Sequence, residues 1–122
     1  MNSRNKGKAG ERELAKVLQK YGYNTRRGQQ YSGIGVADVI GIDHMHIECK
    51  RCQQVRDEAF LDQAENDAKN EVPVVMYRRN HEEWKALLKL DTFMTIWTEL
   101  TEEQKEKIIC KIGQNRKNDK VK

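Results

Sequence analysis

Proline, cysteine and histidine are scarce in this chain of 122 residues, which contains one proline, three cysteines and three histidines. An odd number of cysteines, without the spacing of a secreted disulfide framework, predicts reduced thiols. No run approaches the roughly 20 apolar residues that a membrane-spanning helix needs, and no apolar segment typical of a signal peptide follows the polar residues 1–6. We therefore expect one cytoplasmic domain with a modest core and no membrane partner.

The few cysteines include one pair, Cys49 and Cys52, whose spacing occurs in zinc and redox sites. A thioredoxin-like pair opens a helix, whereas this pair lies at the end of an apolar run. A structural zinc site needs four ligands, and the histidines and Cys110 stand at no recognised spacing from the pair. We expect small buried or edge cysteines here, and a zinc-binding interaction protein remains a third hypothesis for function.

The positive charge of the chain is concentrated at its two ends. Residues 111–122 hold five basic side chains and one acidic one, which equals the whole formal excess of +4. Residues 1–30 hold eight basic side chains against two acidic ones. Such an asymmetry suits a polyanionic partner such as nucleic acid. Solvated helix faces and a frayed tail are the alternative explanation.

Acidic residues interrupt two apolar runs in the middle of the sequence. Asp38 lies within residues 36–42, and Glu48 lies within residues 45–50, two positions before Lys50. Residues two apart on a strand point to the same face, and a tight turn between the runs would pair them. Buried carboxylates cost free energy unless they are paired or bind a metal. The pattern therefore predicts that Asp38 and Glu48 hold a hard divalent cation, with Lys50 placed to orient water or stabilise an anion.

Hydrophobic periodicity and capping patterns predict the remaining elements. We expect helices over residues 7–21, 57–70, 81–90 and 101–112, and strands over residues 23–28, 36–51 (as a hairpin), 72–77 and 93–97. This order, αβββαβαβα, predicts an α/β fold in which helices flank a mixed sheet. We expect the domain to span residues 1–113, followed by a basic, disordered tail at 114–122.

The ordered set of motifs resembles a known family. Asp38…Glu48-x-Lys50 is similar to the signature of the PD-(D/E)xK nuclease superfamily, without its proline. Residues 7–14, Gly-Lys-Ala-Gly-Glu-Arg-Glu-Leu, resemble the first helix of archaeal-type Holliday junction resolvases and their phage relatives. Residues 23–27 are similar to the family's first strand. The resemblance covers roughly residues 7–80 and implies a restriction-endonuclease-like, three-layer fold.

The resemblance also implies roles for individual residues. Glu11 would join Asp38 and Glu48 at a site for Mg²⁺ or Mn²⁺, although without the resemblance the helix dipole explains it better. Gln63 would touch the water or scissile phosphate beside Lys50. Contacts to DNA are expected from basic side chains and one loop serine, namely Lys6, Lys8, Arg12, Arg26, Arg27, Ser32, Arg51, Arg78 and Arg79.

The implied function is that of a metal-dependent endonuclease that cuts phosphodiester bonds of branched, four-way DNA as a homodimer. A nuclease for linear duplex or single strands on the same fold is the nearest alternative, and a nucleic-acid-binding module without activity is another. The apolar residues 93–97 are a candidate dimer contact, though an ordinary core strand explains them nearly as well.

Overall fold

We describe a computed structural model of the chain, which covers residues 3–28 and 37–121. The chain divides into two compact units, residues 1–89 and 90–122, which we call the N-terminal and the C-terminal unit. The N-terminal unit contains the sheet, two helices and every residue of the predicted catalytic site.

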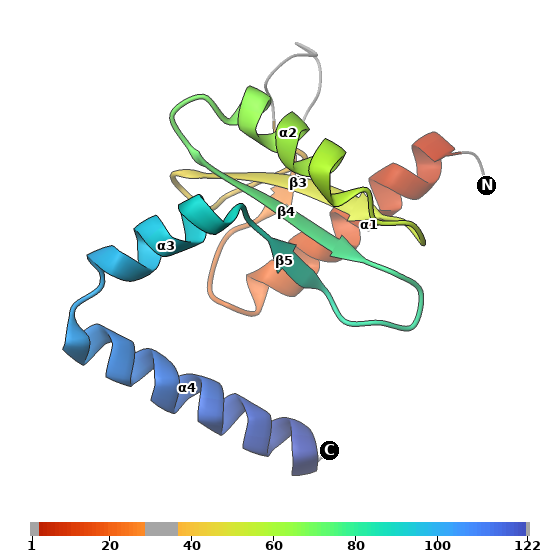
Figure 1. The fold of residues 1–122 in the computed structure, drawn as a ribbon. Helices are drawn as coiled ribbons and strands as arrows, with labels where there is room; N and C mark the ends of the chain where they lie inside the picture. Colours follow the sequence, from red (N-terminus) through yellow and green to blue (C-terminus); the bar gives the residue numbers. More distant parts are fainter. Residues whose placement is uncertain (1–2, 29–36, 122) are drawn as a thin grey trace. The chain divides into compact units, whose positions relative to one another are not determined.

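A five-stranded mixed sheet forms the centre of the N-terminal unit (Figure 1). Its strands lie in chain order and are β1 (Arg26–Arg27), β2 (Val39–Ile40), β3 (Met45–Arg51), β4 (Val72–Arg78) and β5 (Lys85–Leu87). Strands β3 and β4 pair in parallel, and all other neighbours are antiparallel. The parallel pair requires a crossover, which is supplied by a helix, as is usual for parallel strands. The mixed sheet flanked by helices confirms the predicted α/β fold.

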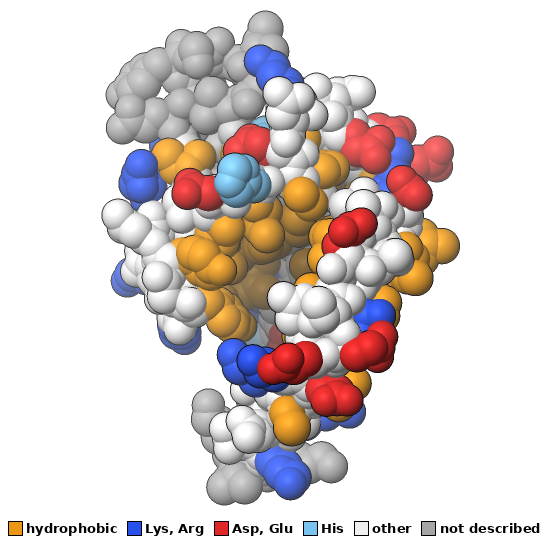
Figure 2. Space-filling view, turned by 90° about the vertical axis from the view of Figure 1, so that its left-hand side faces the viewer, with side chains coloured by type: hydrophobic (Ala, Val, Ile, Leu, Met, Phe, Trp, Pro, Cys, Tyr) orange, Lys and Arg blue, Asp and Glu red, His pale blue; other side chains and the backbone are white. Residues whose placement is uncertain are grey.

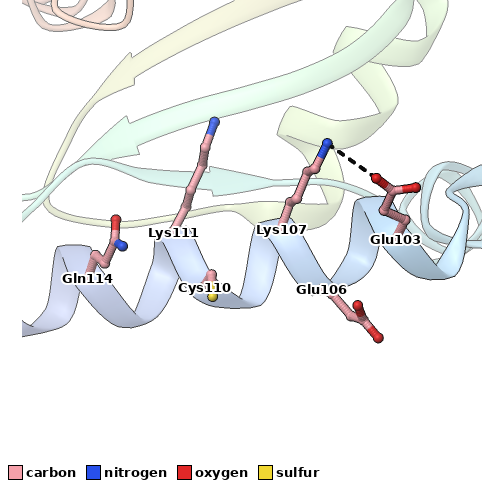
Figure 3. A pocket seen from close by; sticks show the side chains of 6 residues that line it. All are labelled: Glu103, Glu106, Lys107, Cys110, Lys111 and Gln114. Atoms are coloured by element: carbon pink, nitrogen blue, oxygen red, sulfur yellow. Dashed lines mark ion pairs between the residues drawn. The ribbon is translucent and has the colours of Figure 1, made fainter.

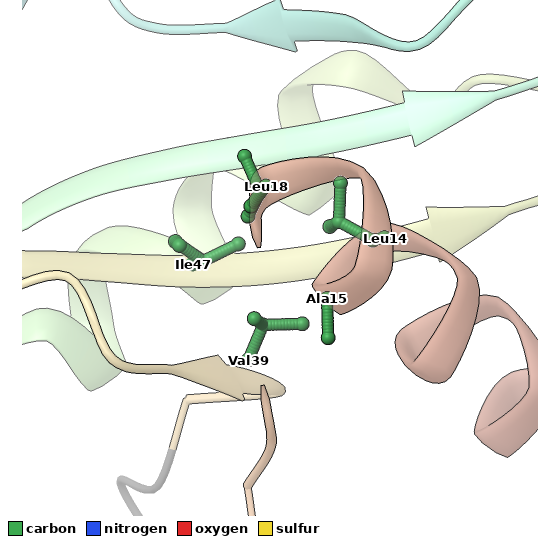
Figure 4. Packing of buried hydrophobic residues seen from close by; sticks show 5 residues of the cluster. All are labelled: Leu14, Ala15, Leu18, Val39 and Ile47. Atoms are coloured by element: carbon green, nitrogen blue, oxygen red, sulfur yellow. The ribbon is translucent and has the colours of Figure 1, made fainter. Parts of the chain in front are cut away.

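Helix α1 (Ser3–Gln19) packs on one face of this sheet and carries the main hydrophobic core. Figure 4 shows Leu14, Ala15 and Leu18 of the helix against Val39 and Ile47 of β2 and β3. These five side chains are at most 8% exposed. Burying each of the larger ones stabilises the fold by about 1.5–3 kcal/mol.

Helix α2 (Asp57–Ala68) contacts β3 and β4 from the opposite face. Because strand residues alternate between faces, Ile47 of β3 points toward α1, whereas Glu48 and Lys50 point toward α2. A hydrogen bond between Lys50 and Gln63 of α2 agrees with this arrangement. Glu48 and Lys50 thus lie on one face of the strand, and the core residue Ile47 lies on the other.

The predicted hairpin between the two acidic runs is present. Asp43 and His44 form the turn between β2 and β3, and His44 has a positive φ of 69°. Gly41, just before this turn, has a φ of 117°, and a side chain there would collide with the backbone carbonyl of Asn24. A glycine at this position lets the hairpin pass close to the segment before β1.

Two elements after β4 differ from the prediction. Residues 81–90 were expected to be helical, but residues 85–87 form β5 instead. Residues 93–97 were expected to be a strand, but they lie in helix α3 (Leu90–Glu99). A five-residue apolar run fits a helix as well as a strand, and Asp91 in the first turn favours the helix through its dipole.

Helix α4 (Glu102–Val121) begins with the predicted capping box. The backbone N–H of Thr101 donates to the side-chain oxygen of Gln104 at 2.8 Å, and the backbone N–H of Gln104 donates to the Thr101 hydroxyl at 3.1 Å. The helix continues past Gly113, so residues 114–121, which were predicted to be a disordered tail, are helical.

Candidate active site

The Asp38 carboxylate is held in place by the hairpin backbone. The Asp38 N–H donates to the Ile47 carbonyl at 3.0 Å, and the Asp38 carbonyl accepts from the Gly28 N–H at 2.8 Å. Its Oδ2 accepts from the Cys49 N–H, also at 2.8 Å. These three bonds join Asp38 to both flanking segments, so the carboxylate is fixed beside β3 before any ligand binds.

Glu48 lies on β3 next to Asp38 and is almost completely buried, with 2% of its surface exposed. Burial, and after it the charge and hydrogen bonding of Asp38, raise the pKa of its carboxyl to about 8, while Lys50 opposes the shift. Lys50 therefore does not fully offset the repulsion that Glu48 and Asp38 would feel if both carboxylates were ionised. Such a pair favours either a shared proton or a bound cation.

Lys50 is oriented by helix α2. Its Nζ donates to Gln63 Oε1 at 3.1 Å and lies 5.0 Å from the centroid of the Phe60 ring. The structure thus brings the predicted Lys50 and Gln63 together. The contact with Phe60 was not anticipated from the sequence.

Glu11 lies on α1, where its Oε2 accepts a hydrogen bond from Arg27 Nε at 2.6 Å. Burial raises the pKa of Glu11, and Arg27 and Asp38 act in opposite directions on it. Among the described residues, however, the group of three possible metal ligands within 4.8 Å of one another is His46, Glu48 and Asp67, without Glu11. The structure therefore places Glu11 near Asp38 but not in one compact group with Asp38 and Glu48.

Glu13 points away from Glu11, as its offset on the helix predicts. It accepts hydrogen bonds from Arg78 Nε at 2.7 Å and from Trp84 Nε1 at 3.2 Å. Arg51 Nε lies 3.7 Å from the same carboxylate. Glu13 consequently joins α1 to β3 and β4 and takes no part in the acidic site.

Five of the six arginines that were predicted to contact DNA have partners within the protein. Arg27 pairs with Glu11, and Arg79 Nη1 lies 3.6 Å from Glu82. Arg26 donates to the Asn24 carbonyl, and Arg51 donates to Asn80. On α1, Arg12 is exposed and Lys8 is half-buried. Ser32 and the side chain of Lys6 lie outside the described part of the chain.

His46 is a buried residue of this region that the sequence reasoning missed. It lies on β3 two residues before Glu48, and its Nε2 is 2.8 Å from Glu48 Oε1. Its other nitrogen, Nδ1, has no hydrogen-bond partner and lies 3.7 Å from Glu71 Oε1. The spacing of His46 and Glu48 on one strand face was visible in the sequence, but this histidine was weighed only as a zinc ligand beside Cys49 and Cys52.

The alternative zinc site at Cys49 and Cys52 gains no support from the described residues. Both cysteines are free thiols, and neither belongs to the group of possible metal ligands. Burial raises the pKa of the Cys49 thiol, and Asp38 raises it further. Cys49 therefore stays a neutral thiol, which is a poor ligand and a poor nucleophile.

The C-terminal unit has a depression of its own, which carries none of the predicted site residues. This shallow depression is lined by side chains of α4 alone (Figure 3), and Lys107 and Glu103 form an ion pair of 3.6 Å across it. None of the predicted catalytic residues lies on this helix. In α3, Phe93 and Trp97 stack with their ring centroids 6.5 Å apart.

Comparison with known proteins identifies the family. A family model described as archaeal Holliday junction resolvase (hjc) matches residues 2–95, which include Asp38, Glu48, Lys50 and Gln63. No curated protein and no solved structure matches the chain. The match covers most of the chain and agrees with the mixed sheet and the acidic pair described above. The chain therefore belongs to the archaeal Holliday junction resolvase family, whose members are nucleases of four-way DNA.

Proposed function

We propose that the chain cuts four-way DNA with the help of Mg²⁺ or Mn²⁺ held by Asp38 and Glu48. The observation that carries this proposal is the contact between two carboxylates: Asp38, whose side chain and backbone together make three hydrogen bonds to neighbouring backbone groups, and Glu48, which is buried and has a raised pKa. An inactive DNA-binding module has no need to place these two groups together at a cost in stability.

The donor set fits a hard divalent cation. Asp38 and Glu48 supply oxygen ligands, which Mg²⁺ and Mn²⁺ prefer, and leave positions for water and a phosphate oxygen. A cation bound there lowers the pKa of water and neutralises charge that develops on the phosphate. Glu11, close to Asp38, can take part through an intervening water.

We assign Lys50 to the water or phosphate at the reacting centre. Hydrolysis forms a bond between the oxygen of water and phosphorus, breaks the bond to the leaving sugar oxygen, and passes a proton to that oxygen. The Lys50 ammonium can donate a hydrogen bond to a phosphate oxygen whose negative charge grows in this step. Gln63 and Phe60 restrain the ammonium, which lowers the entropic cost of positioning it.

The DNA contacts are expected on the surface around α1 and the strand ends. Arg12 is exposed, whereas the five predicted arginines of β1, β3, β4 and the loop after β4 must loosen contacts within the protein to meet phosphate. Phosphate contacts of this kind give affinity without reading sequence.

We also propose that the chain acts as a homodimer in the cytoplasm of the cell that carries the junctions. Two symmetry-related cuts need two sites, and a twofold dimer is the commonest way to supply them. Helix α3 carries exposed apolar side chains suited to such a contact, including Phe93 and Met94, at 49% and 44% exposure. Hydrophobic side chains are also exposed on the surface drawn in Figure 2. Among the described residues, no helix is long and apolar enough to cross a bilayer.

A panel of DNA substrates tests the proposal. Purified protein is incubated with four-way, flap, nicked and linear DNA, each with Mg²⁺, Mn²⁺ or EDTA. We expect paired cuts in the four-way DNA with either cation and no cuts in EDTA. Cutting in EDTA would contradict the metal site. Equal cutting of linear and four-way DNA would contradict the assigned substrate.

A further inference from the structure

A second group of possible metal ligands shares Glu48 with the Asp38–Glu48 pair. Ligand atoms of His46, Glu48 and Asp67 all lie within 4.8 Å of one another. His46 is fully buried and Glu48 is 2% exposed, whereas Asp67 on α2 is only half-buried. Asp67 is therefore the member of the group that reaches solvent. Asp67 also adds to the negative potential at Glu48.

The unpartnered nitrogen of His46 is the second observation that points to a ligand. When Glu48 is ionised and His46 Nε2–H donates to it, Nδ1 faces the Glu71 carboxylate at 3.7 Å as a bare lone pair, which leaves two acceptors facing each other. A buried acceptor without a partner costs about 1–3 kcal/mol. A cation on Nε2 removes this cost, because the ring proton then resides on Nδ1 and points to Glu71.

We propose that His46, Glu48 and Asp67 form a binding site for a second divalent transition-metal ion, with Glu71 as the carboxylate behind the histidine. Metal-bound histidines nearly always donate their other N–H to a carboxylate, carbonyl or water, and Glu71 lies where such a partner is needed. Asp67 completes a set of one nitrogen and two carboxylate donors. The site shares Glu48 with the proposed Mg²⁺ site but does not depend on Asp38.

The donor set selects the kind of cation. Imidazole favours Mn²⁺, Co²⁺ or Zn²⁺ over Mg²⁺, which prefers an all-oxygen shell. Because Glu48 belongs to both groups, it would supply a ligand to each ion when both positions are filled. The catalytic position would then accept Mg²⁺, while the His46 position accepts only the transition metals.

Binding of Co²⁺ to the DNA-free protein tests the second site. Equilibrium dialysis gives the number of ions bound, and visible absorption reports their ligands, since a thiolate adds an intense near-ultraviolet band. We expect two Co²⁺ per wild-type chain without that band, and one in each of Asp67→Asn and Asp38→Asn. Glu71→Gln should keep the site but weaken its affinity roughly 10- to 100-fold. The control is Glu65→Gln, on α2 like Asp67. This variant should still bind two ions, because Glu65 pairs with Lys89 and is not one of the proposed ligands.

Each outcome separates this proposal from the proposed function. One ion that is lost in Asp38→Asn and kept in Asp67→Asn would overturn the second site and leave the Mg²⁺ site intact. One ion that is lost in Asp67→Asn and kept in Asp38→Asn would support the second site and contradict the catalytic one. A thiolate band that disappears in Cys49→Ser would overturn the assigned ligands. Because Asp67 and Glu71 are not fully buried, their variants should fold, and a circular dichroism melt checks this.

Discussion

The raised pKa of Glu48 predicts an unusual dependence of stability on pH. The folded protein holds the Glu48 proton up to about pH 8, whereas the ordinary value for the unfolded chain is 4.5. Between these values the native state binds more protons than the unfolded state, so the free energy of unfolding falls as pH rises. The fall amounts to about 1.4 kcal/mol per pH unit for one proton, or up to about 5 kcal/mol across the window.

Replacement of Glu48 by glutamine isolates this effect. Glu48→Gln keeps the shape of the side chain and removes its charge, so the stability of the variant should no longer fall with pH through this group. Urea unfolding, followed by circular dichroism in EDTA at pH 5, 6, 7 and 8, gives the free energy of unfolding of each protein. The free energy of unfolding of the variant, relative to that of the wild type, should rise steadily from pH 5 to 8. The exposed Glu58→Gln on α2 serves as the matched control and should parallel the wild type.

Divalent cations provide the second half of the experiment. At pH 8, Mg²⁺ that binds Asp38 and Glu48 should restore stability to the wild type, by about 2.7 kcal/mol at a concentration one hundred times its dissociation constant. Mg²⁺ should stabilise Glu48→Gln much less, because the variant lacks one of the two carboxylates. If the wild type and Glu48→Gln show the same pH dependence, Glu48 ionises normally, and the reasoning that links its burial to cation binding is refuted.

Three further changes have expected outcomes. Lys50→Ala should stop cleavage of four-way DNA but leave its binding within about threefold in a gel-shift assay, because most phosphate contacts lie elsewhere; cleavage at the wild-type rate would remove Lys50 from the site. Gly41→Ala should destabilise the fold by about 2 kcal/mol or more in urea, since its φ of 117° and the nearby Asn24 carbonyl oppose a side chain; unchanged stability would show that the hairpin relaxes freely. Deletion of residues 114–122 should flatten the salt dependence of DNA binding, because fewer counterions are released; an identical slope would show that this segment does not meet DNA.

The placement of Glu48 and Lys50 on one face of β3, with Asp38 beside them, was predictable because it depends on local rules. Strand alternation placed Glu48 and Lys50 on one side, and the turn at Asp43 and His44 brought Asp38 beside them. Gln63 followed only from the family resemblance, since glutamines on helices are common. These assignments need no knowledge of how distant segments pack.

The features that the sequence did not reveal depend on contacts between distant segments. Arg27 meets Glu11 across 16 positions, and Arg78 meets Glu13 across 65. No pattern in the sequence indicates that such arginines pair within the protein when DNA is absent. His46 was missed for a similar reason, because its partner Glu71 lies outside β3 and becomes a neighbour only through the β3–β4 pairing. The helix α3 was mistaken for a strand because its apolar run is too short to show a period.

Single-turnover cleavage of four-way DNA by the wild type and Asp38→Asn tests the central claim most directly. Both proteins are used in Mg²⁺ at concentrations that saturate the DNA, and binding is measured in the same samples. The account predicts that Asp38→Asn binds the junction as well as the wild type does and cuts it roughly a thousandfold more slowly, a loss of about 4 kcal/mol in transition-state stabilisation. A variant that binds normally and cuts within about threefold of the wild-type rate would contradict the assignment of the metal site to Asp38 and Glu48.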